Sequence, residues 1–126
     1  MKRATAQWVR KAEADFRLAD QVVRSGEPFH DSVCFHCQQS AEKYLKALLV
    51  ELALPVPRTH DLDRLLTDVV VHHPTLSSIR RGALFLEQFA VETRYPGFNA
   101  TKRQASSALR WASRLRLAVR SVLALP

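Results

Sequence analysis

The sequence predicts an all-α protein, an up-and-down bundle of four long helices with one short helix inserted. Apolar residues recur at three- and four-residue spacing along almost the whole chain, which is the period of an amphipathic helix. β-branched residues never alternate with polar ones over the length of a strand. Only three glycines occur in 126 residues, and the breaks between apolar segments are short, so consecutive long helices should be antiparallel neighbours. We expect one domain spanning residues 1–126.

The first two helices are predicted over about residues 4–24 and 31–52. Ser25 and Gly26 end the first, since glycine readily adopts the left-handed conformation that closes a helix. The second ends before Pro55, because proline cannot continue a helical hydrogen-bond ladder. At about 100° per residue, one apolar stripe of this helix forms the expected core, and it holds Cys34, Cys37, Ala41, Tyr44, Leu45, Leu48 and Leu52.

The third and fourth helices are predicted on either side of His73-Pro74. The third is short, from about Thr59 or Asp61 to Val71, and Asp61 is expected to cap it. The fourth starts after the proline, with Thr75 as its expected cap, and reaches Glu92.

The last helix follows the segment TRYPGFNAT. Tyr95 should be extended because a proline follows it, and Gly97 permits a turn. Thr101 and Gln104 form a capping box, from which a helix runs to the C-terminus.

Positive charge is concentrated at the C-terminal end. The chain has 19 Lys and Arg against 12 Asp and Glu, and the last acidic residue is Glu92. Seven basic residues follow it without compensation: Arg94, Lys102, Arg103, Arg110, Arg114, Arg116 and Arg120. This asymmetry indicates an anionic partner, either nucleic acid or an acidic protein surface. A solvated, arginine-rich helix face is the alternative interpretation.

The stretch HDSVCFHCQQ contains both cysteines and raises the question of a metal or redox site. Cys34 and Cys37 lie on the core stripe, whereas His36 projects about 130° away from it, so these side chains cannot surround one ion. We therefore predict two small buried hydrophobes, with no metal and no cofactor. The chain has no apolar segment of the roughly 20 residues that a membrane span needs and does not begin with an apolar run, so we expect a cytoplasmic protein.

Three segments in order, FHCQQSAEKYLKALL, THDLDRLL and TRYPGF, resemble the HEPN domain family, of the type with a final RYP turn. The resemblance implies a helical bundle that forms a homodimer and is the partner of a minimal nucleotidyltransferase in a two-component, toxin-antitoxin-like system. It also implies binding of nucleotide or RNA, because the family includes ribonuclease toxins as well as modules without catalysis.

The ribonuclease members carry an R-x4-6-H motif near the start of the last long helix. Arg94 stands at the corresponding place, but no histidine follows it anywhere in the chain. RNA cleavage without metal needs a base for the 2′-hydroxyl proton and a cation for the developing phosphorane charge. Arg94 fits only the second role, so the chain is either a binding module or a ribonuclease with an unidentified base, for which His60 is the candidate.

The remaining candidate residues lie in the RYP turn and on the last helix. We predict that Arg94, Tyr95, Lys102, Arg103, Arg110 and Arg114 bind a nucleotide, RNA or the partner. Arg94 and Tyr95 have an alternative role, in which Arg94 caps helix carbonyls and Tyr95 packs under the loop. No aromatic residue is expected among the arginines on the two basic edges of the last helix, so base stacking is not predicted.

Glu42 and Lys46 have the spacing of an ordinary surface ion pair on the second helix.

Overall fold

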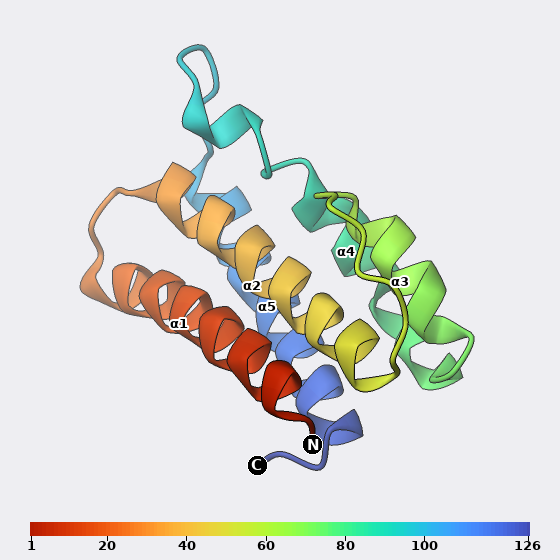
Figure 1. The fold of residues 1–126 in the computed structure, drawn as a ribbon. Helices are drawn as coiled ribbons and strands as arrows, with labels where there is room; N and C mark the ends of the chain where they lie inside the picture. The colour runs from red at the N-terminus through yellow and green to blue at the C-terminus, as the bar shows by residue number, and fades with distance from the viewer.

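The computed structural model describes all 126 residues and contains helices but no strand, which confirms the predicted fold class. Three long helices contact one another, and two short ones pack on α2 and on each other. In chain order they are α1 (Arg3–Ser25), α2 (His30–Glu51), α3 (Leu62–Val70), α4 (Arg80–Glu87) and α5 (Lys102–Val122). In Figure 1, α2 crosses in front of α5, with α1 on one side and α3 and α4 on the other.

The helices α1, α2, α4 and α5 alternate in direction, as an up-and-down bundle requires (Figure 1). Residues 52–61 return along the bundle, so that α3 is the inserted helix and runs in the same direction as α2. The two chain termini lie at the same end of the molecule.

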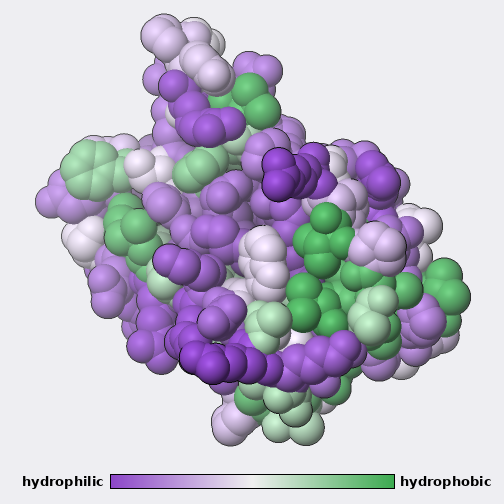
Figure 2. Space-filling model, in the orientation of Figure 1, coloured by the Kyte–Doolittle hydropathy of each residue, from purple (hydrophilic) through white to green (hydrophobic).

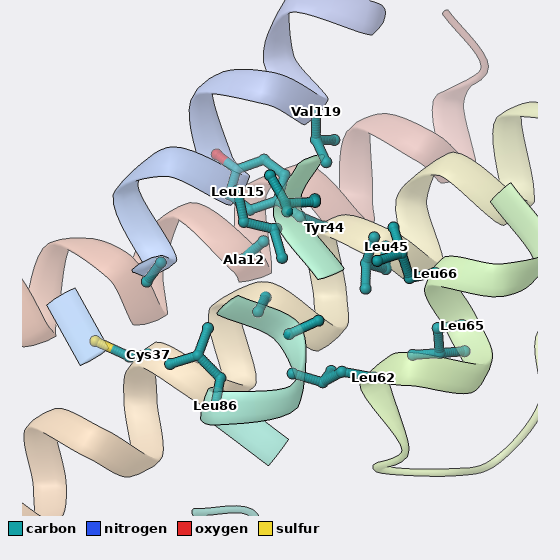
Figure 3. Packing of buried hydrophobic residues seen from close by; sticks show 14 of the residues in the cluster. Ala12, Cys37, Tyr44, Leu45, Leu62, Leu65, Leu66, Leu86, Leu115 and Val119 are labelled. Atoms are coloured by element: carbon teal, nitrogen blue, oxygen red, sulfur yellow. The ribbon is translucent and has the colours of Figure 1, made fainter. Parts of the chain in front are cut away.

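The core is a single hydrophobic cluster of 26 buried residues, and α2 is its central element. The predicted stripe of α2 is confirmed, since all of its residues are buried except Leu52, which is half-buried. Figure 3 shows Tyr44 beside Leu115 of α5, while Leu62, Leu65 and Leu66 approach from α3. Burial of this apolar area is the main favourable contribution to folding.

Three of the predicted helix ends are also confirmed, at Gly26, Asp61 and Thr101. Gly26 closes α1 with a φ of 74°, which is the left-handed conformation. The Asp61 carboxylate accepts a hydrogen bond from the Arg64 amide at 3.1 Å and caps α3. Thr101 and Gln104 form both hydrogen bonds of the capping box of α5.

The fourth helix is shorter than the predicted span of residues 75–92. A 3-10 helix over Pro74–Ile79 comes first, and Thr75 lies inside it rather than capping α4. The Ser78 hydroxyl donates to the Thr75 carbonyl at 3.0 Å, a local bond by which serine competes with the α-helical ladder. After Glu87 the chain leaves the α-helix and makes a second 3-10 turn over Glu92–Arg94.

Hydrophilic residues cover most of α1 on the face shown in Figure 2, whereas hydrophobic residues gather over α3 and the segment before it. Val71, just after α3, is among the most exposed large apolar residues of the molecule. No helix combines the length and the apolar composition that are needed to cross a membrane.

Candidate nucleic-acid interface

The two basic edges of α5 have different environments. On one edge, Arg116 forms two parallel hydrogen bonds of 2.6 Å with the carboxylate of Glu13, which lies on α1. Arg120 on the same edge donates to the Tyr44 hydroxyl at 3.2 Å, and that hydroxyl donates to Glu13 at 2.6 Å. These arginines therefore tie α5 to α1 and α2, and they are not free to bind an external anion.

The same contacts shift the pKa values of this cluster. The Arg116 hydrogen bond, supported by Tyr44 and Arg120, outweighs the cost of burial and lowers the pKa of Glu13 to about 2. Burial, followed by the hydrogen bond to Glu13, raises the pKa of Tyr44. Glu13 is thus ionised and Tyr44 neutral at physiological pH.

This cluster predicts a pH dependence of stability. Because the folded pKa of Glu13 lies below its ordinary value of 4.5, its contribution to stability is fully present above about pH 4.5 and is lost as the pH falls toward 2. The difference in the free energy of unfolding between wild type and Glu13→Gln should be constant from pH 6 to 5 and shrink toward pH 2.5. Urea denaturation of both proteins across this range measures it, and a constant difference down to pH 2.5 would contradict it.

The other edge of α5 faces solvent without acidic partners. We call Arg103, Arg110 and Arg114 the basic row; successive members lie seven and four residues apart, on one side of the helix. All three are exposed, and none forms an ion pair with a carboxylate. Lys102, on the first turn of α5, is also exposed and unpaired, but it lies about 100° around the helix from Arg103, on the edge of Arg116 and Arg120. Positive charge on the edge of the basic row is therefore available to a ligand.

An aromatic residue does lie within the basic row, contrary to the sequence prediction. Trp111 is only half-buried, and the guanidinium carbon of Arg114 lies over its ring, 5.0 Å from the centroid. Arg110, Trp111 and Arg114 together line a surface hollow of about 310 Å³. Trp111 and Arg114 are three residues apart on a helix, a spacing at which side chains are neighbours, so the sequence does contain a signal for this contact.

Arg94 lies against α2 rather than on the carbonyls of a helix end. Its guanidinium carbon is 5.5 Å from the centre of the Phe35 ring, an arrangement of the cation-π type. Tyr95 has extended backbone, as expected before proline, but its side chain is 60% exposed. The capping alternative is therefore wrong for both residues, and both side chains stay accessible.

His60 is not brought to Arg94. Its Nδ1 is 2.7 Å from a carboxylate oxygen of Glu42, while Arg94 lies on Phe35. Glu42 and Phe35 are seven residues apart on α2, which corresponds to about 10 Å along the helix axis. The predicted pairing of Arg94 with His60 as a catalytic cation and base has no support in this geometry.

Glu42 and Lys46 form the predicted ion pair, at 3.1 Å, but it is buried instead of lying on the surface. Glu42 also accepts a hydrogen bond from the fully buried Gln38 at 3.2 Å, and Lys46 lies over the ring of Trp8. The pair is compensated by these contacts, as buried charges must be. The segment QQSAEKYLK thus contributes an internal polar network to the bundle.

A second polar cluster joins α1 to α2. Asp15 binds the Nδ1 of His36 at 2.8 Å and the ammonium group of Lys43. Burial opposes ionisation of this carboxyl, but the two partners outweigh it and lower the pKa of Asp15.

Cys34 and Cys37 are free and buried, as predicted. Burial raises the pKa of Cys34 to about 12, so it is a protonated thiol at neutral pH. No group of three or more His, Cys, Asp or Glu side chains has the arrangement of a metal site.

Sequence reasoning missed two residues on which this surface depends. Glu13 determines which arginines of α5 form intramolecular contacts. In the sequence, however, Glu13 shows only the spacing of a surface ion pair with Arg17. Gly82 on α4 provides the space for Trp111, since a β-carbon there would lie 2.2 Å from Cε3 of the indole. Neither contact leaves a local pattern, because the partners are far apart in the chain.

Comparisons with known proteins agree with the fold and the sequence resemblance. The structure is similar to that of TT1696 from Thermus thermophilus, with a TM-score of 0.83 and 25% identity, over 95% of this chain and 98% of that one. It is also similar to ST0689, described as an archaeal HEPN homologue, with a TM-score of 0.73 and 28% identity, over 96% and 98% of the two chains. A comparison with curated protein sequences gives no significant match. The family model of the HEPN domain matches residues 5–122, and the chain therefore belongs to the HEPN domain family.

Proposed function

We propose that this HEPN domain is a binding module for the phosphates of RNA or of a nucleotide, and that the basic row of α5 is its main contact. The proposal includes a homodimer that is the partner of a minimal nucleotidyltransferase in a toxin-antitoxin-like system. The observation that supports it most strongly is that the arginines of α5 fall into two sets, one bound internally and one exposed. Arg116 and Arg120 bind Glu13 and Tyr44 internally, whereas the basic row is exposed and has no carboxylate to neutralise it.

The arrangement suits contact with a phosphate backbone. Members of the basic row are separated by about 10 Å and about 6 Å along the helix axis, which spreads the charge over more than one phosphate. Guanidinium groups bind phosphate oxygens with two parallel hydrogen bonds. Arg94, Tyr95 and Lys102 lie in and just after the turn that leads into α5 and extend the proposed surface beyond its N-terminal end.

RNA binding tests the proposal. A triple variant of Arg103, Arg110 and Arg114 to Gln should bind a fluorescent octauridylate at least 10-fold more weakly at 50 mM salt. If each arginine neutralises one phosphate, the slope of log affinity against log salt should fall by about 2, since one single-strand contact contributes about 0.7. Fluorescence anisotropy measures both quantities.

Arg58→Gln is the matched control, because Arg58 is an exposed arginine in the segment before α3, outside the proposed surface. Equal losses in the triple variant and in Arg58→Gln would contradict a role for the basic row. Absence of RNA and nucleotide binding by the folded wild type would refute the proposed function as a whole.

The assembly is tested separately. Light scattering coupled to size-exclusion chromatography should give twice the 14.3 kDa chain mass at high protein concentration. A monomer at every concentration would remove the dimer from the proposal. A co-expressed minimal nucleotidyltransferase that never elutes with the protein would remove that partner.

Ribonuclease activity is the alternative function left open by the sequence. It needs a base near Arg94, and His60 does not supply one, because its ring binds Glu42 about two helical turns away. Incubation of RNA with the protein in EDTA should therefore leave the RNA intact on a denaturing gel. Cleavage by the wild type that is lost in Arg94→Ala would establish the ribonuclease instead.

A further inference from the structure

We propose that the hollow around Trp111 is a binding site for one unpaired nucleotide, whose phosphate is held by Arg110 and Arg114 and whose base stacks on the layer formed by Arg114 and Trp111. This inference rests on the proposed function and assigns one site within the basic row. The group that this site would recognise is a phosphate next to an unstacked base, and two kinds of ligand contain it. Its source is either a single strand of RNA or a free nucleoside 5′-monophosphate.

The composition of the hollow supports an anionic ligand. Two of its three lining residues are arginines, and no carboxylate contributes to its wall. The guanidinium of Arg110 has one intramolecular hydrogen bond, to the Ser107 hydroxyl at 3.1 Å, so most of its donors stay free. A volume of about 310 Å³ at the surface leaves room for a ligand larger than a bare ion.

The aromatic layer is held in place before any ligand arrives. Trp111 packs against the backbone of α4 at Gly82, where any side chain would overlap the indole. Arg114 lies over the ring at 5.0 Å, so that its conformational freedom is already reduced in the free protein. A base can extend this stack on the guanidinium plane, as unpaired bases do on arginine and aromatic side chains. Such preorganisation lowers the entropic cost of binding.

The other tryptophan provides an internal comparison. Trp8, on α1, lines a different hollow of about 470 Å³ with Arg10 and Lys11, but its ring is already covered by Lys46 of the buried network. We assign the nucleotide to Trp111 because the cation over its ring is an exposed, planar guanidinium on which a base can stack, whereas Lys46 over Trp8 is an ammonium group paired with Glu42.

Fluorescence of single-tryptophan proteins tests the assignment. In Trp8→Phe, where Trp111 is the only tryptophan, adenosine 5′-monophosphate or octauridylate should change the emission in a saturable way. Inorganic phosphate should compete with the nucleotide without changing the emission, since it has no base. Adding Arg110→Gln or Arg114→Gln should weaken nucleotide binding by at least 10-fold.

Arg103→Gln is the matched control, because Arg103 belongs to the basic row but does not line the hollow. It should weaken octauridylate binding and leave binding of the monophosphate unchanged. A response to octauridylate alone identifies a subsite for a longer strand, and a response to both ligands identifies a nucleotide site; both support the proposal. In the wild type, the indole N–H resonance of Trp111 should shift and that of Trp8 should not, which gives a second measurement without a core substitution.

Three results would overturn the inference. Anisotropy that shows RNA binding through the basic row, with no change at Trp111, would refute the site while leaving the proposed function intact. A response confined to Trp8 would place the base on α1 instead. Absence of both RNA and nucleotide binding would refute the inference together with the proposed function.

Discussion

Glu13→Ala should lower the free energy of unfolding by about 3 kcal/mol, since the variant leaves the guanidinium of Arg116 without its bidentate partner in a site that is mostly buried. It also removes the acceptor of the Tyr44 hydroxyl, at the contact between α1, α2 and α5. For a chain of this length, the expected fall in melting temperature is about 10 °C. Thermal denaturation followed by circular dichroism measures it.

Glu27→Ala is the matched control for this experiment. Glu27 is an exposed carboxylate in the connection between α1 and α2, and its side chain forms no ion pair. Its removal should change the free energy of unfolding by no more than about 0.5 kcal/mol. Similar melting temperatures for the two variants would contradict the structural role of Glu13. Arg116 would then have to be included among the arginines of α5 that can bind a ligand.

Gly82→Ala should destabilise the protein by about 2 kcal/mol, although alanine is the better helix former by about 1 kcal/mol. The added β-carbon would lie 2.2 Å from Cε3 and 2.6 Å from Cδ2 of Trp111. The indole is rigid and half-buried, so relief requires a shift of α4 relative to α5. Urea denaturation of the single variant measures the effect.

A double-mutant cycle with Trp111→Leu identifies the cause. In the leucine background the overlap disappears, and Gly82→Ala should become neutral or stabilising, which gives a coupling energy of at least about 1.5 kcal/mol. Additive effects of the two substitutions would mean that the glycine is needed for some other reason. The cycle also reports on the site proposed around Trp111, because displacement of the ring alters the wall of the hollow.

The fold could be predicted from sequence wherever local chemistry decides it. The apolar stripe of α2, Gly26 at the end of α1 and the capping box of Thr101 each depend on neighbours within one or two turns, and all three are confirmed. The prediction of the fourth helix failed because its apolar spacing continues through a 3-10 turn. Pro74 and the local bond from Ser78 to Thr75 favour that turn over an α-helix, and the spacing does not reveal it.

The candidate site was predictable only in part, because it depends on contacts between distant residues. The sequence identifies a basic α5 but cannot separate Arg116, which is bound to Glu13, from Arg110, which is free. Likewise, the spacing of Glu42 and Lys46 predicts their ion pair, whereas its burial depends on how residues 52–61 and Trp8 cover that face of α2.

The pairing of Glu13 with Arg116 joins residues that are 103 positions apart, and this has a consequence during synthesis of the chain. While the protein emerges from the ribosome, α1 and α2 can form a hairpin early, but the Glu13 carboxylate lacks its arginine partner, and the part of α2 that packs on α5 stays uncovered, until α5 is released. The bundle can therefore close only after α5 has left the ribosome, and until then the nascent chain carries exposed apolar surface that favours aggregation or chaperone binding. A chain cut before residue 116 should accumulate as this open intermediate, without the native bundle.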